Sequence, residues 1–380
     1  MPSISLNNIA KMSAAGSGKT YDICNSALEQ ARSGNRVLIT TYTNRGAESV
    51  RNEIRLQNDG VLHPLVIVKT WYVFMLSELI KPYQRYLTQR VGGVKGFDYS
   101  QSYGYINYAK AGTIRRYLTD SKNVRSNEGA SLACLLNSLS NGKVITRLEM
   151  VYSTIFFDEI QDMVGDDLEI IRLLINSSIG VVFCGDNKQA TFSTHNTKKN
   201  KAKTGKNIWQ FFSEMEKNGS VIVERNLSSR RFNQQICCFA NSIFPVGEPI
   251  TTIMTDQTDH DGVFLIAVSD VSDYLAAYSP QVLRYDKTFD NYGRFAVNFG
   301  ACKGETYERV LIVPNGPLTD FVMKGTALSS PEKYYVAVTR PKYSIAIAFK
   351  KLPKALSGYE ETMIACGNTS IRALKYIISD

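Results

Sequence analysis

The sequence predicts an α/β protein with two domains, each built around a parallel β-sheet. Short apolar runs rich in Val, Ile and Phe recur along the 380 residues, and helical patterns separate many of them. Several runs end in polar or glycine-containing turns, which is typical of strands buried on both faces. Because strands that alternate with helices form parallel sheets, the pattern indicates α/β domains. The runs are residues 37–42, 154–157, 180–183, 221–223, 263–268, 310–314 and 334–338.

The chain length and one stretch without the alternating pattern set the expected domain organisation. A chain of this length corresponds to roughly two to three domains. Residues 71–147 are rich in Tyr, Lys and Arg and have a mostly helical pattern, so we interpret them as an insertion into the first domain. The expected domains are residues 1–70 with 148–220, and residues 221–380. Helices between the strands are expected at residues 21–32, 45–55 and 167–175.

The composition favours a polyanionic partner and excludes a membrane span. The formal net charge is +9, and positive charge suits nucleic acid because phosphate contacts provide most non-specific affinity. The apolar runs are too short to cross a bilayer, and residues 1–11 lack the pattern of a signal peptide. We therefore expect a cytoplasmic location and no membrane association. The basic residues 194–207 form either a solvated loop or an arm that contacts phosphates.

A phosphate-binding loop is predicted at residues 13–20, between a short apolar strand and a helix. Its small residues allow backbone N–H groups to face an anion, and the following helix N-terminus adds its dipole. Lys19 is expected to reach the β- and γ-phosphates of ATP, and the Thr20 hydroxyl to bind Mg²⁺. The alternative is a glycine-rich turn that holds no ligand. The expected nucleotide contacts are Ala15, Gly16, Ser17, Gly18, Lys19, Thr20 and Tyr21.

Carboxylates follow the apolar run at residues 154–157. Because ligands bind at the carboxyl ends of parallel strands, Asp158 and Glu159 are expected to face the nucleotide. Asp158 would hold Mg²⁺, and Glu159 would accept a proton from the attacking water. The alternative is a group of carboxylates that caps the next helix.

Seven motifs in order resemble those of the UvrD/Rep/PcrA-type superfamily 1 DNA helicases. Residues 41–47 (TYTNRGA) are similar to TFTNKAA, residues 70–72 (TWY) to Thr-Phe-His, and residues 158–162 (DEIQD) to DEFQD. Residues 185–189 (GDNKQ) are similar to GDxxQ. In the second half, Arg231 with Ile236 and Asn241 resembles NYRS…I…AN, Lys303 with Gly304 resembles KGLEF, and residues 335–340 (YVAVTR) resemble YVAxTRA.

The resemblance implies two RecA-like domains that hydrolyse ATP with Mg²⁺ in the cleft between them. It makes Glu159 the base, Gln189 the γ-phosphate sensor, and Arg231 and Arg340 arginine fingers. Arg230 stands where the family stacks an aromatic ring on adenine, and Gly304 lies in a nucleotide-contacting motif. The DNA-binding residues implied by the resemblance are Thr41, Tyr42, Thr43, Asn44, Thr70, Trp71, Tyr72 and Phe192.

Two functions follow from this resemblance. The first is an ATP-driven translocase or helicase on single-stranded DNA, or on a duplex with a single-stranded tail, with 3′-to-5′ polarity. The second is a DNA-stimulated ATPase subunit that regulates a nuclease or other effector, as in the helicase-like subunits of bacterial defence systems. Thr194 replaces the Trp that the family stacks on a base, and the segment from Asn241 to Gly300 is too short for the family's second-domain insertion. Both departures favour the second function.

Overall fold

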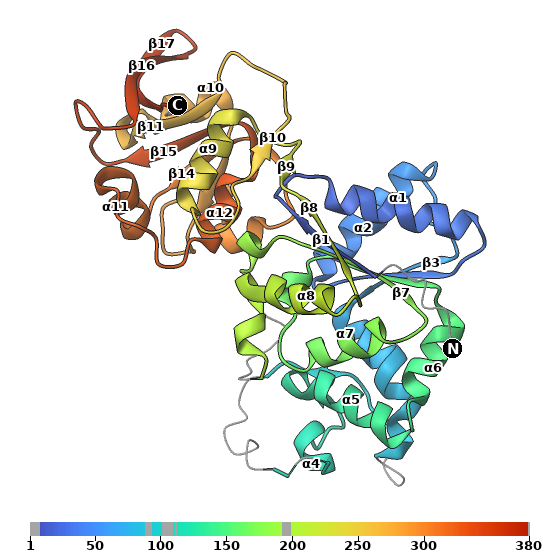
Figure 1. The fold of residues 1–380 in the computed structure, drawn as a ribbon. Coiled ribbons are helices and arrows are strands. Elements are labelled where there is room, and N and C mark those ends of the chain that lie inside the picture. The colour runs from blue at the N-terminus through green and yellow to red at the C-terminus, as the bar shows by residue number, and fades with distance from the viewer. Residues whose placement is uncertain (1–7, 88–92, 101–108, 111, 192–198, 379–380) are drawn as a thin grey trace. The chain divides into compact units, whose positions relative to one another are not determined.

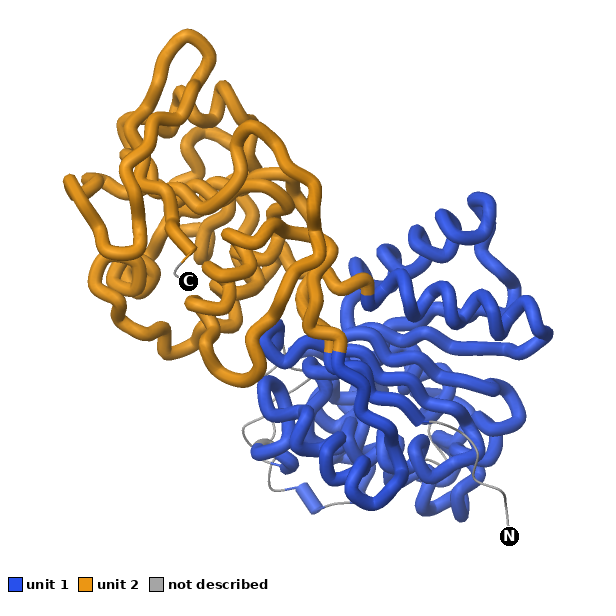
Figure 2. Tube along the Cα trace, turned by 45° about the horizontal axis from the view of Figure 1, so that its top comes forward, with its two compact units in different colours: residues 1–12, 19–225 blue, residues 13–18, 226–380 orange. Residues whose placement is uncertain are grey.

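The computed structural model describes residues 8–87, 93–100, 109–110, 112–191 and 199–378. The chain divides into two compact units, which are coloured separately in Figure 2. Unit 1 comprises residues 1–12 and 19–225, and unit 2 comprises residues 13–18 and 226–380. The units divide after residue 225, five residues beyond the expected boundary at residue 220. Residues 13–18, which are most of the phosphate loop, belong to unit 2.

Unit 1 is built on a six-stranded sheet in the order β3-β2-β6-β7-β1-β8. The pairings from β3 through β1 are all parallel, as the alternating pattern predicts. The strands are β1 (Ile9–Ser13), β2 (Val37–Thr41), β3 (Val66–Thr70), β6 (Thr154–Phe157), β7 (Gly180–Gly185) and β8 (Ile222–Asn226).

Helices cover both faces of this sheet because its central strands are apolar on both sides (Figure 1). On one face, α1 (Lys19–Arg32) and α2 (Asn44–Gln57) pack against side chains such as Phe156. On the other face, α7 (Asp167–Ile175) and α8 (Ile208–Lys217) pack against Phe157 and Phe183. Short 3-10 turns close the loops between these elements: η5 (Ile160–Asp162), η6 (Asn187–Gln189), η7 (Lys201–Lys203) and η8 (Gly205–Asn207).

The segment predicted as a mostly helical insertion is mostly helical in its described part. It also contains a short parallel pair, β4 (Phe97–Asp98) with β5 (Val124–Arg125), that the sequence pattern did not indicate. Its buried side chains, among them Leu79, Leu132 and Leu136, belong to the same core as sheet residues Ile155 and Phe157. The helices are α3 (Trp71–Phe74), the π-helical η1 (Met75–Ile80), η2 (Lys81–Tyr86), α4 (Ile114–Tyr117), η4 (Ser126–Glu128), α5 (Gly129–Leu139) and α6 (Lys143–Val151).

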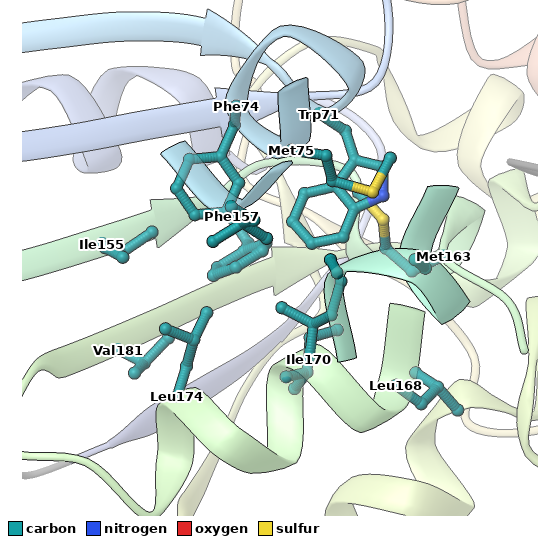
Figure 3. Packing of buried hydrophobic residues seen from close by; sticks show 14 of the residues in the cluster. Trp71, Phe74, Met75, Ile155, Phe157, Met163, Leu168, Ile170, Leu174 and Val181 are labelled. Atoms are coloured by element: carbon teal, nitrogen blue, oxygen red, sulfur yellow. The ribbon is translucent and has the colours of Figure 1, made fainter. Parts of the chain in front are cut away.

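Trp71 lies at the centre of this shared core (Figure 3). None of its surface is exposed, and its ring centroid lies 5.6 Å from that of Phe74 and 5.8 Å from that of Phe157. Its indole Nε1 donates a hydrogen bond of 2.8 Å to the buried Asp167 carboxylate, so the polar atom of the ring is satisfied. Trp71 therefore joins the first residue of α3 to the first residue of α7.

We expect Trp71→Ala to destabilise unit 1 by about 3–5 kcal/mol, because it removes a large buried side chain and its hydrogen bond to the buried Asp167 carboxylate. The measurement is denaturant unfolding followed by circular dichroism. Val73→Ala is the control, since Val73 is a half-exposed neighbour in the same short helix. Equal unfolding midpoints for the two variants would contradict a core role for Trp71.

Unit 2 is built on a seven-stranded, mostly parallel sheet in the order β13-β12-β14-β15-β11-β17-β16. The first five strands in this order pair in parallel, and β17 and β16 add an antiparallel edge. The strands are β11 (Gly262–Ala267), β12 (Gln281–Arg284), β13 (Ala296–Asn298), β14 (Tyr307–Val313), β15 (Pro341–Phe349), β16 (Tyr359–Cys366) and β17 (Thr369–Tyr376). The predicted class, an α/β protein with parallel sheets, is therefore confirmed.

Helices also cover both faces of the second sheet (Figure 1). On one face lie α9 (Gln234–Ile243), α11 (Gly316–Lys324) and α12 (Glu332–Val338), and on the other lies α10 (Val271–Tyr278). The remaining elements are the pair β9 (Ser228–Ser229) and β10 (Thr251–Thr252), with the short turns η9 (Val268–Asp270) and η10 (Phe299–Cys302). No helix in the described ranges is both long and apolar enough to cross a membrane.

One predicted strand is wrong. The apolar run at residues 334–338 lies in α12, and the strand follows it as β15. All five residues of the run are buried. A short helix that is enclosed by other elements is apolar throughout, as is a strand buried on both faces. Periodicity alone does not separate these two cases over so short a length.

Candidate nucleotide and nucleic-acid site

Four neighbouring strands of unit 1 end at the same edge of the sheet. The Cα pairings join Thr70 to Thr41, Thr40 to Phe157, and Phe157 to Phe183. The residues that follow these strands therefore share that edge. They come from four separate predicted motifs and include Tyr42, Trp71, Asp158 and Asp186.

The phosphate loop has the backbone that an anion site needs. Gly16 and Gly18 adopt φ values of 73° and 95°, in the left-handed region that favours glycine. Within unit 2, a Cβ on Gly16 would lie 2.5 Å from the Arg231 Cβ, so a larger residue does not fit there. The Ser17 hydroxyl is buried and has no hydrogen-bond partner among the described residues, and α1 begins directly after the loop. These features fit a phosphate group, which accepts hydrogen bonds from such a loop and helix N-terminus.

Thr20 and Asp158 lie together in unit 1. The Thr20 hydroxyl donates to Asp158 Oδ2 across 3.4 Å. The Asp158 backbone N–H donates to the Thr40 carbonyl at 2.8 Å, which fixes the residue at the end of β6. Hydroxyl and carboxylate oxygens are ligands that Mg²⁺ accepts, so this pair fits the predicted metal position.

Glu159 occupies a strained position directly after Asp158. Its φ and ψ of 61° and 45° are in the left-handed region, which residues other than glycine adopt rarely. The Glu159 carboxylate accepts a short hydrogen bond from the side-chain amide of Gln161. Strained residues of this kind concentrate at functional sites.

A chain of hydrogen bonds connects Glu159 to Gln189. The Gln161 Oε1 accepts from the Asp186 backbone N–H at 3.1 Å, and Asp186 Oδ2 accepts from Gln189 Nε2 at 2.8 Å. Gln161, Asp186 and Gln189 are all buried. The acidic strand end and the GDxxQ-like motif are therefore one network. Sequence reasoning selected Glu159 and Gln189 but missed Gln161 and Asp186, although both lie inside the quoted motifs.

Gly185 permits the close approach that this network requires. A Cβ at this position would overlap Gln161 Oε1 and lie 2.7 Å from Ile160 Cγ2. Both of these atoms lie on the segment that follows β6, whereas Gly185 ends β7. The glycine therefore sets the distance between the two motif segments.

We expect Gly185→Ala to lower ATP hydrolysis by up to about 10²-fold, because a shift of Gln161 displaces Glu159 from its working position. Steady-state phosphate release tests this, with thermal unfolding measured in parallel. Gly316→Ala is the control, because a Cβ there meets nothing within 4 Å. Normal turnover in Gly185→Ala would show that the network does not position the base.

The predicted DNA-binding residues differ in exposure. Thr43 and Asn44 are exposed at the start of α2, where Thr43 Oγ1 accepts from the Gly46 N–H at 2.9 Å. Thr70 caps α3 by accepting from the Val73 N–H at 3.4 Å. Thr41, Thr70, Trp71 and Tyr72 are buried, Tyr42 is half-buried, and Phe192 lies outside the described residues. The fully buried Trp71 indole packs inside unit 1 and has no exposed surface that could contact a nucleic acid.

The second-half motifs meet in unit 2, at the amino ends of β14 and β15. Arg231 Nη1 donates to the Thr339 carbonyl at 3.1 Å, and Arg340 Nη2 donates to the Thr339 hydroxyl at 3.1 Å. Arg340 is buried, and its Nε also donates to the Val336 carbonyl at 2.8 Å. Gly304, with φ of 89°, precedes β14. Thr339 thus connects the two predicted arginine fingers.

The same unit brings Arg230 against the phosphate loop. The Arg230 backbone N–H donates to the Gly16 carbonyl at 2.8 Å. A Cβ on Gly18 would lie 3.9 Å from Arg230 Nη1, and the Arg230 side chain is exposed. Positive charge therefore lies beside the glycines of the loop.

Unit 2 also contains a hollow of about 820 Å³. It is lined by residues at the carboxyl ends of β11, β14 and β15, including Val268, Val313 and Phe349. Gly304 and Arg340 lie before β14 and β15, at the opposite ends of these strands. The hollow is therefore separate from the predicted motif residues.

Comparisons with known proteins give likenesses among solved structures. No family model matches the sequence, and no curated protein matches it. Among solved structures, the chain is similar to an arterivirus non-structural protein 10, a helicase whose structure was solved in complex with DNA. The identity is 13% and the TM-score 0.43, over 90% of this chain and 61% of that helicase. A likeness of this size decides nothing about activity, and the chain spans less than two thirds of the helicase's length.

Proposed function

We propose that this chain is a nucleic-acid-stimulated ATPase, a UvrD-like motor that acts on single-stranded DNA. The observation that carries the proposal is the hydrogen-bond chain from Glu159 to Gln189 beside the Thr20–Asp158 pair. A carboxylate, a metal-binding pair and a buried amide at one sheet edge form the set that hydrolysis of a nucleoside triphosphate requires. The two motifs resembling DNA contacts end the neighbouring strands β2 and β3.

Each candidate site residue of unit 1 has a proposed role in ATP hydrolysis. Lys19 and the N–H groups of the phosphate loop hold the phosphates, and Thr20 and Asp158 hold Mg²⁺. When bound, this ion neutralises charge that develops on the phosphate oxygens. Glu159 accepts the proton of the attacking water, and its bond from Gln161 keeps the carboxylate in place. Gln189 is held by Asp186 in the orientation needed to sense the γ-phosphate.

Arginines of unit 2 are the proposed source of positive charge. Arg230 and Arg231 belong to the same compact unit as loop residues 13–18, which supports a role toward the nucleotide. The planar Arg230 guanidinium is suited to stack on the base, with Gly304 as a further nucleotide contact. Arg231 is the proposed arginine finger. Arg340, the second proposed finger, also supports Thr339, which accepts the bond from Arg231.

One observation favours the second candidate, a DNA-stimulated ATPase that regulates a nuclease or another effector. Residues 242–300, all of which the structure describes, contribute β10, β11, α10, β12 and β13 to unit 2 and contain no separate domain. A motor without a second-domain insertion has less surface with which to hold a duplex junction. Weak grip favours slippage, because each base-pair step costs about 1.4 kcal/mol to open.

The decisive experiment measures ATP hydrolysis by the purified chain with no nucleic acid, with oligo-dT and with blunt duplex. We expect stimulation by oligo-dT that weakens as salt rises, because phosphate contacts release counterions. Absence of hydrolysis under all three conditions would overturn the proposal. Single-turnover displacement of a long labelled strand separates the two candidates: processive displacement by the chain alone identifies a helicase, and hydrolysis without displacement identifies the regulatory ATPase.

A further inference from the structure

Four aromatic rings gather at the edge of unit 1 that carries the predicted DNA motifs. Tyr42 follows β2, Tyr72 lies in α3 after β3, and Phe97 and Tyr99 come from the inserted segment. The ring centroid of Tyr72 lies 6.2 Å from that of Tyr42, 4.9 Å from that of Phe97 and 5.2 Å from that of Tyr99. We call these four residues the aromatic cluster. Tyr72 is its centre, since it contacts each of the other three rings.

The four rings of the aromatic cluster differ in solvent exposure. Tyr72 is 9% exposed and supports the others, Tyr42 and Phe97 are half-buried, and Tyr99 is 60% exposed. Tyr99 stands nearly perpendicular to Tyr72, at 82°, and its centroid also lies 6.2 Å from that of Phe97. A ring that only filled the core would be covered. Tyr99 is instead held by other rings and keeps most of its own surface open.

The chemistry of the cluster suits a nucleic-acid base. Tyrosine is uncharged at physiological pH, and partial desolvation raises the pKa of Tyr42 and Tyr99 further, so neither ring repels phosphates. Exposed Lys95 lies on the same short segment as Tyr99 and adds positive charge. Single-stranded bases stack on fixed, uncharged aromatic rings on positively charged surfaces, and stacking tolerates any base.

We propose that Tyr99 is a base-stacking residue, supplied by the inserted segment to a single strand that passes the edge bearing Tyr42 and Tyr72. The proposal rests on the proposed function, because it assumes that this edge binds single-stranded nucleic acid. Tyr72 and Phe97 hold the Tyr99 ring in place, and Tyr99 itself contacts the base. The inserted segment then contributes to grip as well as to the core.

The test compares the affinity of the full chain and its Tyr99→Ala variant for a labelled oligo-dT, and for the same strand with abasic sites. Loss of one stacking contact weakens binding of oligo-dT by about 5- to 150-fold. Because the abasic strand offers no ring, Tyr99→Ala has no such effect on it. Tyr99→Phe keeps the ring and binds like the unsubstituted chain.

The control is Tyr86→Ala, which removes another half-exposed tyrosine of the inserted segment, one whose ring contacts Tyr83. It leaves affinity unchanged. If Tyr99→Ala binds oligo-dT normally, the inference fails and the proposed function stands. An equal loss on both strands also overturns it, since the contact is then not stacking. If the unsubstituted chain binds no single strand, the proposed function fails, and the inference fails with it.

Discussion

Lys19→Ala abolishes measurable ATP hydrolysis and leaves the fold intact. Lys19 is the only cationic residue of the phosphate loop, and it opens α1 at the point where the loop ends. Without it, the phosphates lose a positive charge as negative charge shifts onto the leaving oxygen. Removing one such electrostatic contact lowers turnover by at least about 10²–10³-fold. Phosphate release at saturating ATP is the measurement, with circular dichroism and thermal unfolding to establish that the variant is folded.

Lys11→Ala is the matched control for this prediction. Lys11 precedes the loop in β1 and pairs with Glu224 at 3.7 Å on the surface of the sheet. Exposed pairs contribute little to stability, so this variant unfolds and hydrolyses ATP normally. Turnover in Lys19→Ala that matches turnover in Lys11→Ala would refute the assignment of residues 13–20 as a phosphate loop.

Glu159→Gln lowers turnover by about 10²–10⁴-fold, the usual contribution of a positioned base, and leaves ATP and DNA binding unchanged. The substitution keeps the size of the side chain, and the new amide oxygen still accepts the hydrogen bond from Gln161. The geometry of the network therefore survives, and only the proton acceptor is lost. Single-turnover hydrolysis and equilibrium binding of a fluorescent ATP analogue separate these two effects.

Glu149→Gln makes the same chemical change in α6, where the carboxylate accepts from the Ser178 N–H at 2.8 Å. It hydrolyses ATP at the normal rate. Loss of nucleotide binding in Glu159→Gln would indicate that Glu159 is structural, and the base would then have to be sought elsewhere on the same edge.

Much of the fold follows from local pattern. The apolar runs at residues 154–157 and 180–183 coincide with β6 and with the first four of the six residues of β7, because a strand buried on both faces has a continuous apolar sequence. The run at residues 334–338 has the same character and forms a helix. Which of the two structures forms there depends on the core that surrounds the run, and no local window contains that information.

In the candidate site, too, some residues follow from local sequence motifs and others only from the folded structure. Spacing and residue type select Lys19, Asp158 and Glu159, because their chemistry is local to short motifs. The hydrogen bond from the Asp186 N–H to Gln161 Oε1 joins residues that are 25 positions apart and follow neighbouring strands, so it depends on sheet order. Trp71 shows that resemblance to a motif does not fix the position of a side chain. It lies in a motif that resembles a DNA-contacting one, but it is a core residue here. Tyr99 has no motif at all, and only the folded chain brings its ring to Tyr72.

The common core of the inserted segment and the first sheet has a consequence for how this chain can be altered. Many insertions fold apart from their host and can be excised or exchanged as cassettes. Here Leu79, Leu132 and Leu136 pack in one cluster with β6, the strand that Asp158 follows. Excision would expose the apolar underside of the sheet, which favours aggregation. Substitutions in this segment are therefore constrained by the packing beneath the acidic strand end, and they are best tolerated at surface positions such as Tyr86 and Leu139.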